Sequence, residues 1–223
     1  MKNMKIAVLI PIKNRSKNII KTINSVINQT YFKNFKNEYV IYLIDDHSDD
    51  DLYDVIKDVK NLIYMKNKHA GISAALNTGI FHIMNDEEIE YIARLDADDE
   101  WYPEKIEIQM DFLKKNPQID ICGTGVRLLG KTNIFYGTYP ETHEEIVKSI
   151  KDKNINPLCH PSLLIKKNIF YYCGIYNDMN LKAEDFDLWK RCLYFNCKFY
   201  NIKQILISIV GKQEDFTCMG LDF

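Results

Sequence analysis

YIARLDADD, residues 91–99, joins a predicted strand directly to a cluster of carboxylates. The strand is expected over Tyr91 to Leu95, and Asp96, Asp98 and Asp99 follow it almost without a break. In open α/β sheets, ligands bind beyond the carboxyl ends of the strands. The acidic cluster therefore lies where such a sheet would place a binding site.

Three similar segments precede this one and set the fold class. Short apolar runs predict buried strands at residues 5–12, 39–44 and 62–65. Each is followed by a predicted helix, at 19–27, 52–59 and 71–84, and Asn14 and Ser16 are candidate N-caps of the first. Successive strand–helix units imply right-handed crossovers, which favours an α/β fold with a mostly parallel sheet.

The pattern is less regular after the acidic cluster. Pro103 suits the first turn of a helix that runs to about Lys115, and a fifth strand is expected over residues 121–129. Another helix is predicted over residues 182–195, and residues 199–210 suggest two short strands. We therefore expect a single Rossmann-like α/β/α domain over residues 1–223.

Composition argues against several classes of protein. The chain of 223 residues has a net charge of −2, which argues against nucleic-acid binding. No secretory signal or run of about 18 apolar residues is apparent, so a cytoplasmic protein is expected. The six cysteines include no CxxC pair, and Cys192 and Cys197 lack a matching second pair. A zinc site is therefore not expected, and the cysteines are interpreted as reduced thiols.

Asp96, Asp98 and Asp99 are the strongest candidates for chemistry. Carboxylates this close in sequence repel one another unless a cation neutralises them. Hard oxygen ligands suit Mg²⁺ or Mn²⁺, which also bind substrate phosphates. The alternative is a solvated acidic turn in which Asp99 caps the following helix.

Two further acidic pairs are candidates. Asp45 and Asp46 end the predicted second strand, where they could accept hydrogen bonds from a base or a ribose hydroxyl, or simply form a turn. Glu184 and Asp185 begin the last predicted helix, where they could act as capping residues or supply a catalytic base. Trp189 lies one helical turn after Asp185 and could line a sugar site or the core.

The remaining candidates have equally open interpretations. His160 could be structural or ligand-facing. Gly71 permits close backbone approach to a ligand, although a turn is the simpler interpretation. Asn14 and Arg15, just after the first predicted strand, could also face the ligand, although a solvated Arg15 is the simpler interpretation.

Taken together, six segments resemble the family 2 glycosyltransferases, which share the GT-A fold. They are, in chain order, VLIPIKNRSKNIIKTINSVINQTY, YLIDDHSDDD, NKHAGISAALNTGI, IARLDADDEWYPEKIEIQMDFL, CHPSLLI and AEDFDLW. Each motif is weak alone, but six in the family's order are highly specific. The resemblance implies an inverting enzyme that moves a sugar from a nucleotide-sugar donor, usually a UDP-sugar, onto an acceptor.

The resemblance also implies residue roles. Asp98, with Asp96 at the other DxD position, would hold Mn²⁺ or Mg²⁺, and Asp185 would be the catalytic general base. The nucleotide would contact Pro11, Asn14, Asp45, Asp46, Gly71, Asn77 and Asp96. The sugar and acceptor side would comprise Glu184, Trp189, His160, Trp101 and Asp99.

The same resemblance implies how the domain is divided and which acceptor it serves. Residues 1–100 would form the nucleotide-sugar half and 101–223 the acceptor half. The acceptor would be a glycan or lipid-linked glycan of surface polysaccharide or lipopolysaccharide synthesis, which allows peripheral association with the inner face of the plasma membrane. The sequence does not fix the oligomeric state.

The final segment, GKQEDFTCMGLDF, lacks the Arg or His that often closes over the donor in this family. A catalytically degenerate nucleotide-sugar-binding module is therefore the main alternative. A nucleotidyltransferase usually has a glycine-rich phosphate loop, which PIKNRSKN lacks. A glycosidase would need a protonated acid rather than a metal-binding cluster.

Overall fold

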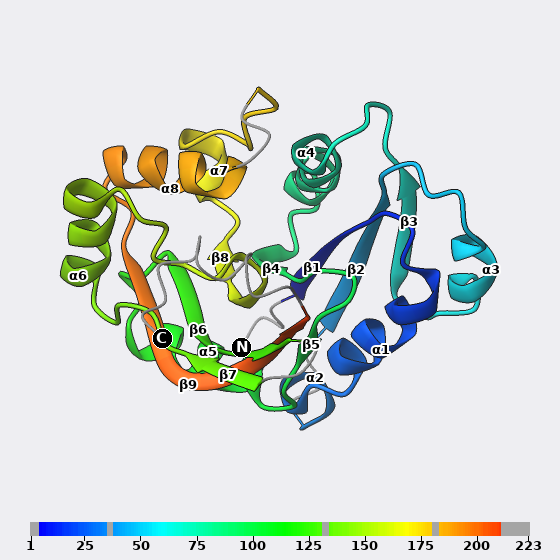
Figure 1. Ribbon diagram of the computed structural model, residues 1–223, viewed down its shortest axis with the longest axis horizontal. Helices are drawn as coiled ribbons and strands as arrows, with labels where there is room; N and C mark the ends of the chain where they lie inside the picture. The colour runs from blue at the N-terminus through cyan, green and yellow to red at the C-terminus, as the bar shows by residue number, and fades with distance from the viewer. Residues whose placement is uncertain (1–4, 35–37, 131–133, 180–182, 211–223) are drawn as a thin grey trace.

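The computed structural model describes residues 5–34, 38–130, 134–179 and 183–210 (Figure 1). The segment GKQEDFTCMGLDF, with Cys218, and the first residue of the helix expected from 182 lie outside this range. The first half contains β1 Lys5–Ile12, α1 Ser16–Ile27, α2 Thr30–Asn34, β2 Glu38–Asp45, α3 Leu52–Ile56, β3 Leu62–Lys66, α4 Ile72–Met84 and β4 Ile89–Arg94.

The second half has shorter elements. They are β5 Glu100–Trp101, α5 Lys105–Lys115, β6 Ile121–Leu129, β7 Ile134–Gly137, α6 His143–Lys148, a π-helical turn Ser149–Lys153, a 3₁₀ turn His160–Ser162, β8 Leu164–Lys166, α7 Ile169–Tyr172, α8 Glu184–Tyr194 and β9 Phe199–Val210. Among the described residues, no helix has the length and apolar character that a membrane crossing requires.

The described strands form one sheet in the order β3-β2-β1-β4-β8-β6-β9-β5, with β7 paired to β6. Strands β3, β2, β1 and β4 are parallel to one another, and β6 is parallel to β9. Because β8 is antiparallel to both β4 and β6, the latter two run in the same direction. The sheet is therefore mostly parallel, and the expected α/β class is confirmed.

Helices cover both faces of the sheet, as alternation along β1 requires. Ile6, Val8 and Ile10 belong to a core that also contains buried residues of α1, α3 and α5. Ala7 and Leu9 face a second core shared with α4 and α8. Figure 1 shows α4 and α1 on opposite sides of β1 and β2. This three-layer packing leaves the strand ends free to carry a site.

The structure corrects three details of the sequence prediction. Residues 199–210 form one strand rather than two, because register shifts around Gly125 keep β9 paired with β6. Helix α1 begins without a side-chain cap, and its Ser16 N–H donates instead to Asp50 Oδ2 at 2.9 Å. Helix α5 begins at Lys105, so Pro103 lies in the turn before it.

Gly79 allows α4 to approach the sheet closely, which predicts a stability effect. A Cβ there would overlap Leu9 Cδ1 and lie 3.2 Å from Ile44 Cγ1. We expect Gly79→Ala to lower the free energy of unfolding by about 1–3 kcal/mol through overpacking, although alanine favours helix by about 1 kcal/mol. Denaturant unfolding of Gly79→Ala, Leu9→Ala and the double variant measures the change in the free energy of unfolding. The double variant should lose less than the sum of the single losses, and strict additivity would contradict the overlap.

Candidate functional site

The carboxyl ends of β1, β2 and β4 lie side by side at one edge of the sheet, because these strands are parallel neighbours. Pro11 is buried near the end of β1, Asp45 ends β2, and Asp96 lies just beyond β4. The fold therefore brings together groups that are far apart in the sequence.

A buried cation accompanies the acidic cluster. Arg94, the last residue of β4, is 4% exposed, and its Nη1 lies 2.5 Å from Asp96 Oδ1. Burial disfavours the charge on Arg94, but Asp96 and Asp99 favour it, and the net result is a raised pKa. Arg94 Nε has no hydrogen-bond partner among the described residues. Arg94 is thus a permanent positive charge with an unused donor.

The charge of Arg94 also reaches the start of α8. Burial raises the pKa of both Glu184 and Asp185, and Arg94 lowers both. Asp96 raises the pKa of Glu184 further. The carboxylates after β4 and those at the start of α8 therefore share one electrostatic environment around Arg94.

Asp98, like Asp96, is partly open to solvent. Its side chain is 25% exposed, and its Oδ2 lies 3.1 Å from Arg15 Nε in the loop after β1. A cavity of about 540 Å³ adjoins the pair and is also lined by Asn14 and Asp50. Asp98 can therefore be reached from solvent.

Asp99 is the most buried member. It is 1% exposed, its Oδ1 accepts a hydrogen bond from the Val210 N–H at 3.0 Å, and its Oδ2 has no partner among the described residues. Burial, followed by the charge of Asp96, raises the pKa of Asp99 well above its ordinary value. Asp99 thus fixes the end of β9 to the acidic cluster.

The donor atoms are of the kind that a hard divalent cation prefers, although the three carboxylates do not lie close enough together in this structure to form a ready-made group of ligands. Asp96, Asp98 and Asp99 offer carboxylate oxygens, which Mg²⁺ and Mn²⁺ prefer. Asp99 Oδ2 is a buried oxygen without a partner among the described residues, whereas Asp98 is paired with Arg15, which an ion would have to displace. The cluster therefore has the composition of a cation site.

Asp45 and Asp46 tie the end of β2 to the neighbouring loops. Asp45 accepts hydrogen bonds from the Ser48 N–H at 2.8 Å and from the Tyr64 hydroxyl at 2.7 Å. Asp46 Oδ1 accepts one from the Gly71 N–H at 2.9 Å, at the start of α4. Both carboxylates are buried, yet their oxygens retain lone pairs for a further hydrogen bond.

Asn14 and Gly71 have positive φ angles in the loops at the carboxyl ends of the parallel strands. Asn14 has φ of 53°; its N–H donates to Ser48 Oγ at 3.0 Å, and its Oδ1 accepts from the Asp49 N–H at 2.8 Å. Gly71 has φ of 128°, a region that favours glycine. Asn14 thus joins the loops that follow β1 and β2, and Gly71 permits the turn into α4.

A second pocket, of about 670 Å³, adjoins β3 and α4. Its polar lining includes Lys66, Asn67, Lys68, His69 and Asn77. Asn77 Nδ2 donates to the Tyr176 carbonyl at 2.9 Å, and the Tyr176 N–H donates back to Asn77 Oδ1 at 2.9 Å. Lysines on one wall favour an anionic ligand, and Asn77 also holds the chain segment that leads to α8.

Asp185 lies half-buried in the first turn of α8. Its Oδ2 accepts a hydrogen bond from Asn156 Nδ2 at 2.7 Å, and its Oδ1 accepts one from the Phe186 N–H at 2.7 Å. Burial raises the pKa of Asp185, and these hydrogen bonds oppose that rise. A fixed carboxylate with a raised pKa is suited to general-base chemistry.

The aromatic side chains expected on the acceptor side are buried. Trp189 has no exposed surface, and His160 and Trp101 are 7% and 3% exposed. His160 Nε2 lies 2.7 Å from the Tyr176 hydroxyl, and its ring meets that of Trp189 edge-on at 5.8 Å. Trp101 Nε1 donates to the Pro161 carbonyl at 3.2 Å. Contact between Trp189 and a sugar would therefore require the core to open.

Sequence reasoning missed Arg94, Asn156 and Tyr176. Arg94 carried a signal, because a charged residue inside the apolar run YIARL is rarely buried unless it is paired. Asn156 and Tyr176 lie in irregular segments without periodicity. Their partners Asp185 and His160 are 29 and 16 positions away, so only the fold reveals these contacts.

Comparison with known proteins agrees with the motifs. The model of the family described as glycosyl transferase family 2 matches residues 7–173. The O-antigen biosynthesis glycosyltransferase WbnJ of Escherichia coli is 28% identical over 218 residues, which covers 91% of this chain and 78% of WbnJ.

The fold is also that of solved glycosyltransferases. S. aureus TarS 1–349 in complex with UDP superposes with a TM-score of 0.74 at 18% identity, covering 96% of this chain and 62% of that chain. The complex of the same TarS segment with UDP-GlcNAc gives a TM-score of 0.73 at 16% identity, over 94% and 59%. This chain thus spans less than two thirds of these TarS chains, and the expected GT-A fold is confirmed.

Proposed function

The chain belongs to glycosyl transferase family 2, as its motifs predicted, and we propose that it transfers a sugar from a UDP-sugar to a glycan or lipid-linked glycan acceptor. The observation that carries this proposal is the shared electrostatic environment of the two acidic groups, one after β4 and one at the start of α8, around Arg94. One group suits a diphosphate-bound cation and the other a general base, and an inverting sugar transfer can use both.

The proposed site for the sugar donor lies at the carboxyl ends of β1, β2 and β4. Pro11, Asp45 and Asp46 face the nucleoside in this scheme, and Asn14, Gly71 and Asn77 line the rest of the donor pocket. TarS structures hold UDP and UDP-GlcNAc, which supports a UDP-sugar here. The name of WbnJ supports an acceptor of the surface-polysaccharide class. We place the reaction in the cytoplasm, at the inner face of the plasma membrane, where a lipid-linked acceptor would be reached.

The cation proposal concerns Mn²⁺ or Mg²⁺. Asp98 would hold the ion in this scheme, with Asp96 at the second DxD position and the buried Asp99 next to Asp98 in the chain. When bound, the ion stabilises negative charge on the leaving diphosphate. Arg15, which pairs with Asp98, would have to give way to the ion, and Arg94 keeps Asp96 oriented through their ion pair.

The base proposal concerns Asp185. Asn156 orients its carboxylate, which accepts the proton of the acceptor hydroxyl. The hydroxyl oxygen forms a bond to the anomeric carbon, and the bond from that carbon to the phosphate oxygen breaks with its electron pair on UDP. Attack from the opposite face inverts the anomeric centre. Glu184 lies beside the base, while His160, Trp101 and Trp189 support the acceptor wall from the core.

Asp185→Asn tests the base. We expect UDP binding to stay nearly unchanged while turnover falls on the order of 100-fold or more, because the amide cannot accept the proton. The readout is UDP release with the best donor and acceptor found in a screen of UDP-sugars and glycans. Asp187→Asn, in the same helical turn, is the matched control and should keep its turnover. An Asp185→Asn enzyme that retained most of its turnover would remove Asp185 as the base.

Asp98→Ala tests the cation site by calorimetric titration of UDP with Mn²⁺ and again with EDTA. Wild-type protein should bind UDP more tightly with Mn²⁺, because the ion would be held by the carboxylate and would offset the negative charge of the diphosphate. The variant should lose most of that difference, and Asp54→Ala, which removes an exposed carboxylate paired with Lys57, should keep it. Equal UDP affinity with and without Mn²⁺ in the wild type would make the cation assignment wrong.

A further inference from the structure

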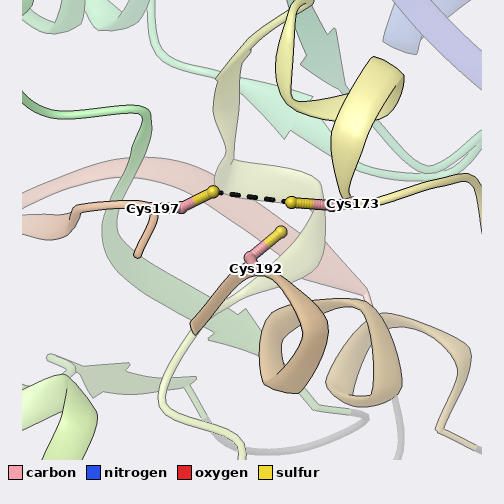
Figure 2. Close-up of side chains that lie close together, drawn as sticks. All are labelled: Cys173, Cys192 and Cys197. Carbon is pink, nitrogen blue, oxygen red and sulfur yellow. Dashed lines mark hydrogen bonds between the residues drawn. The ribbon is translucent and has the colours of Figure 1, made fainter. Parts of the chain in front are cut away.

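Three cysteines from separate segments meet in the core that α7 and α8 cover (Figure 2). Cys173 directly follows α7, Cys192 lies in α8, and Cys197 precedes β9. Their Sγ atoms lie within 4.8 Å of one another, and those of Cys173 and Cys197 are 3.5 Å apart. Figure 2 shows the three side chains pointing toward one another.

The sequence alone argued against a zinc site because Cys192 and Cys197 lack a second pair. The fold supplies the missing ligand in Cys173, which lies 24 positions before Cys197. A Zn–S bond is about 2.3 Å long, so three sulfurs around one ion are separated by roughly 3.7–4.0 Å. The separation of one pair, 3.5 Å, is slightly below that range, and all three sulfurs lie within 4.8 Å of one another, so small shifts of the side chains would suffice to reach it.

A cation from the protein lies beside this cluster. Arg191 donates from Nη1 to the Cys173 carbonyl and from Nη2 to the Ile175 carbonyl at 2.8 Å. Its Nε donates to Asp187 at 3.0 Å, which fixes the guanidinium between α8 and the segment after α7. A positive charge held here would offset the excess negative charge of a metal–thiolate group.

Simple packing does not explain the convergence of the three thiols. Cys122 and Cys159 are also buried and free, so the core accommodates other thiols outside any such group of three. By contrast, Cys173, Cys192 and Cys197 are 4%, 0% and 2% exposed and direct all three sulfurs at one point. Convergence of this kind is what a metal ion requires of its ligands.

We propose that Cys173, Cys192 and Cys197 form a three-thiolate site for a thiophilic divalent ion of the Zn²⁺ class. Binding one Zn²⁺ releases three thiol protons to solvent and leaves a net charge of −1 on the metal and its ligands. The ion ties the end of α7 to α8 and to the start of β9. Because the other end of α8 carries Asp185, this site braces the helix that presents the proposed base.

The test uses the full chain, purified under reducing conditions without a metal-binding tag and stripped with a chelator. Titration with Co²⁺ should give thiolate-to-metal charge-transfer absorption that saturates at one equivalent and is abolished by Zn²⁺. Cys192→Ala and Cys197→Ala should lower the affinity at least tenfold. The matched variants Cys122→Ala and Cys159→Ala should keep it, as should Asp98→Ala, which separates this site from the carboxylates.

Because a cysteine variant could fail to fold, the wild-type protein supplies a second measurement. Zn²⁺ added to stripped protein should raise the Tm in a concentration-dependent way, since the ion binds the folded state. The absence of thiolate absorption with Co²⁺, together with an unchanged Tm on adding Zn²⁺, would overturn the proposal. Equal loss of Co²⁺ absorption in Cys122→Ala and Cys192→Ala would also overturn it.

Discussion

The ion pair between Arg94 and Asp96 is the interaction on which the candidate site depends. Arg94 is the last residue of a buried parallel strand, and a guanidinium there is tolerated only with a partner. Its charge acts on Asp96 and Asp99 after β4 and on Glu184 and Asp185 at the start of α8. Without that charge, the pKa values of Glu184 and Asp185, which burial already raises, would rise further.

The site is assembled across the sheet rather than along the chain. The Val210 N–H at the end of β9 donates a hydrogen bond to Asp99, and the Asn156 side chain donates one to Asp185. Asn77 on α4 holds the backbone at Tyr176. Each bond joins segments that are distant in sequence. One continuous sheet therefore joins the first half of the chain to the second, and the proposed metal–thiolate site would add a further connection at α8.

Much of the fold could be predicted because its parallel half follows a simple rule. Apolar runs such as residues 5–12 and 39–44 alternate with amphipathic helices, and the structure has a strand at each. The short strands β5, β7 and β8 were missed, because two to four residues are too few to show an alternation of apolar and polar side chains. The tail was split into two strands because Lys203 and Gln204 interrupt its apolar pattern, whereas the bulge opposite Gly125 lets β9 continue.

The candidate site could be predicted only in part. Acidic clusters at strand ends gave the positions of Asp45, Asp96 and Asp98, because strand direction fixes where they lie. The sequence could not show that Trp189 is buried, since helical spacing puts it on the face of Asp185 without saying what covers that face. Nor could it pair Asn156 with Asp185 or bring Cys173 to Cys192, because these contacts depend on loop geometry.

The dependence of the site on Arg94 is tested most directly by titrating the Asp185 carboxyl with carbon-detected NMR in wild-type protein and in Arg94→Met. Circular dichroism checks that the variant is folded, and Arg94→Lys, which keeps a cation, is the control. We expect the pKa of Asp185 to rise in Arg94→Met and to rise less in Arg94→Lys, because the positive charge that lowers this pKa is lost only in Arg94→Met. An unchanged pKa of Asp185 in folded Arg94→Met would contradict the account.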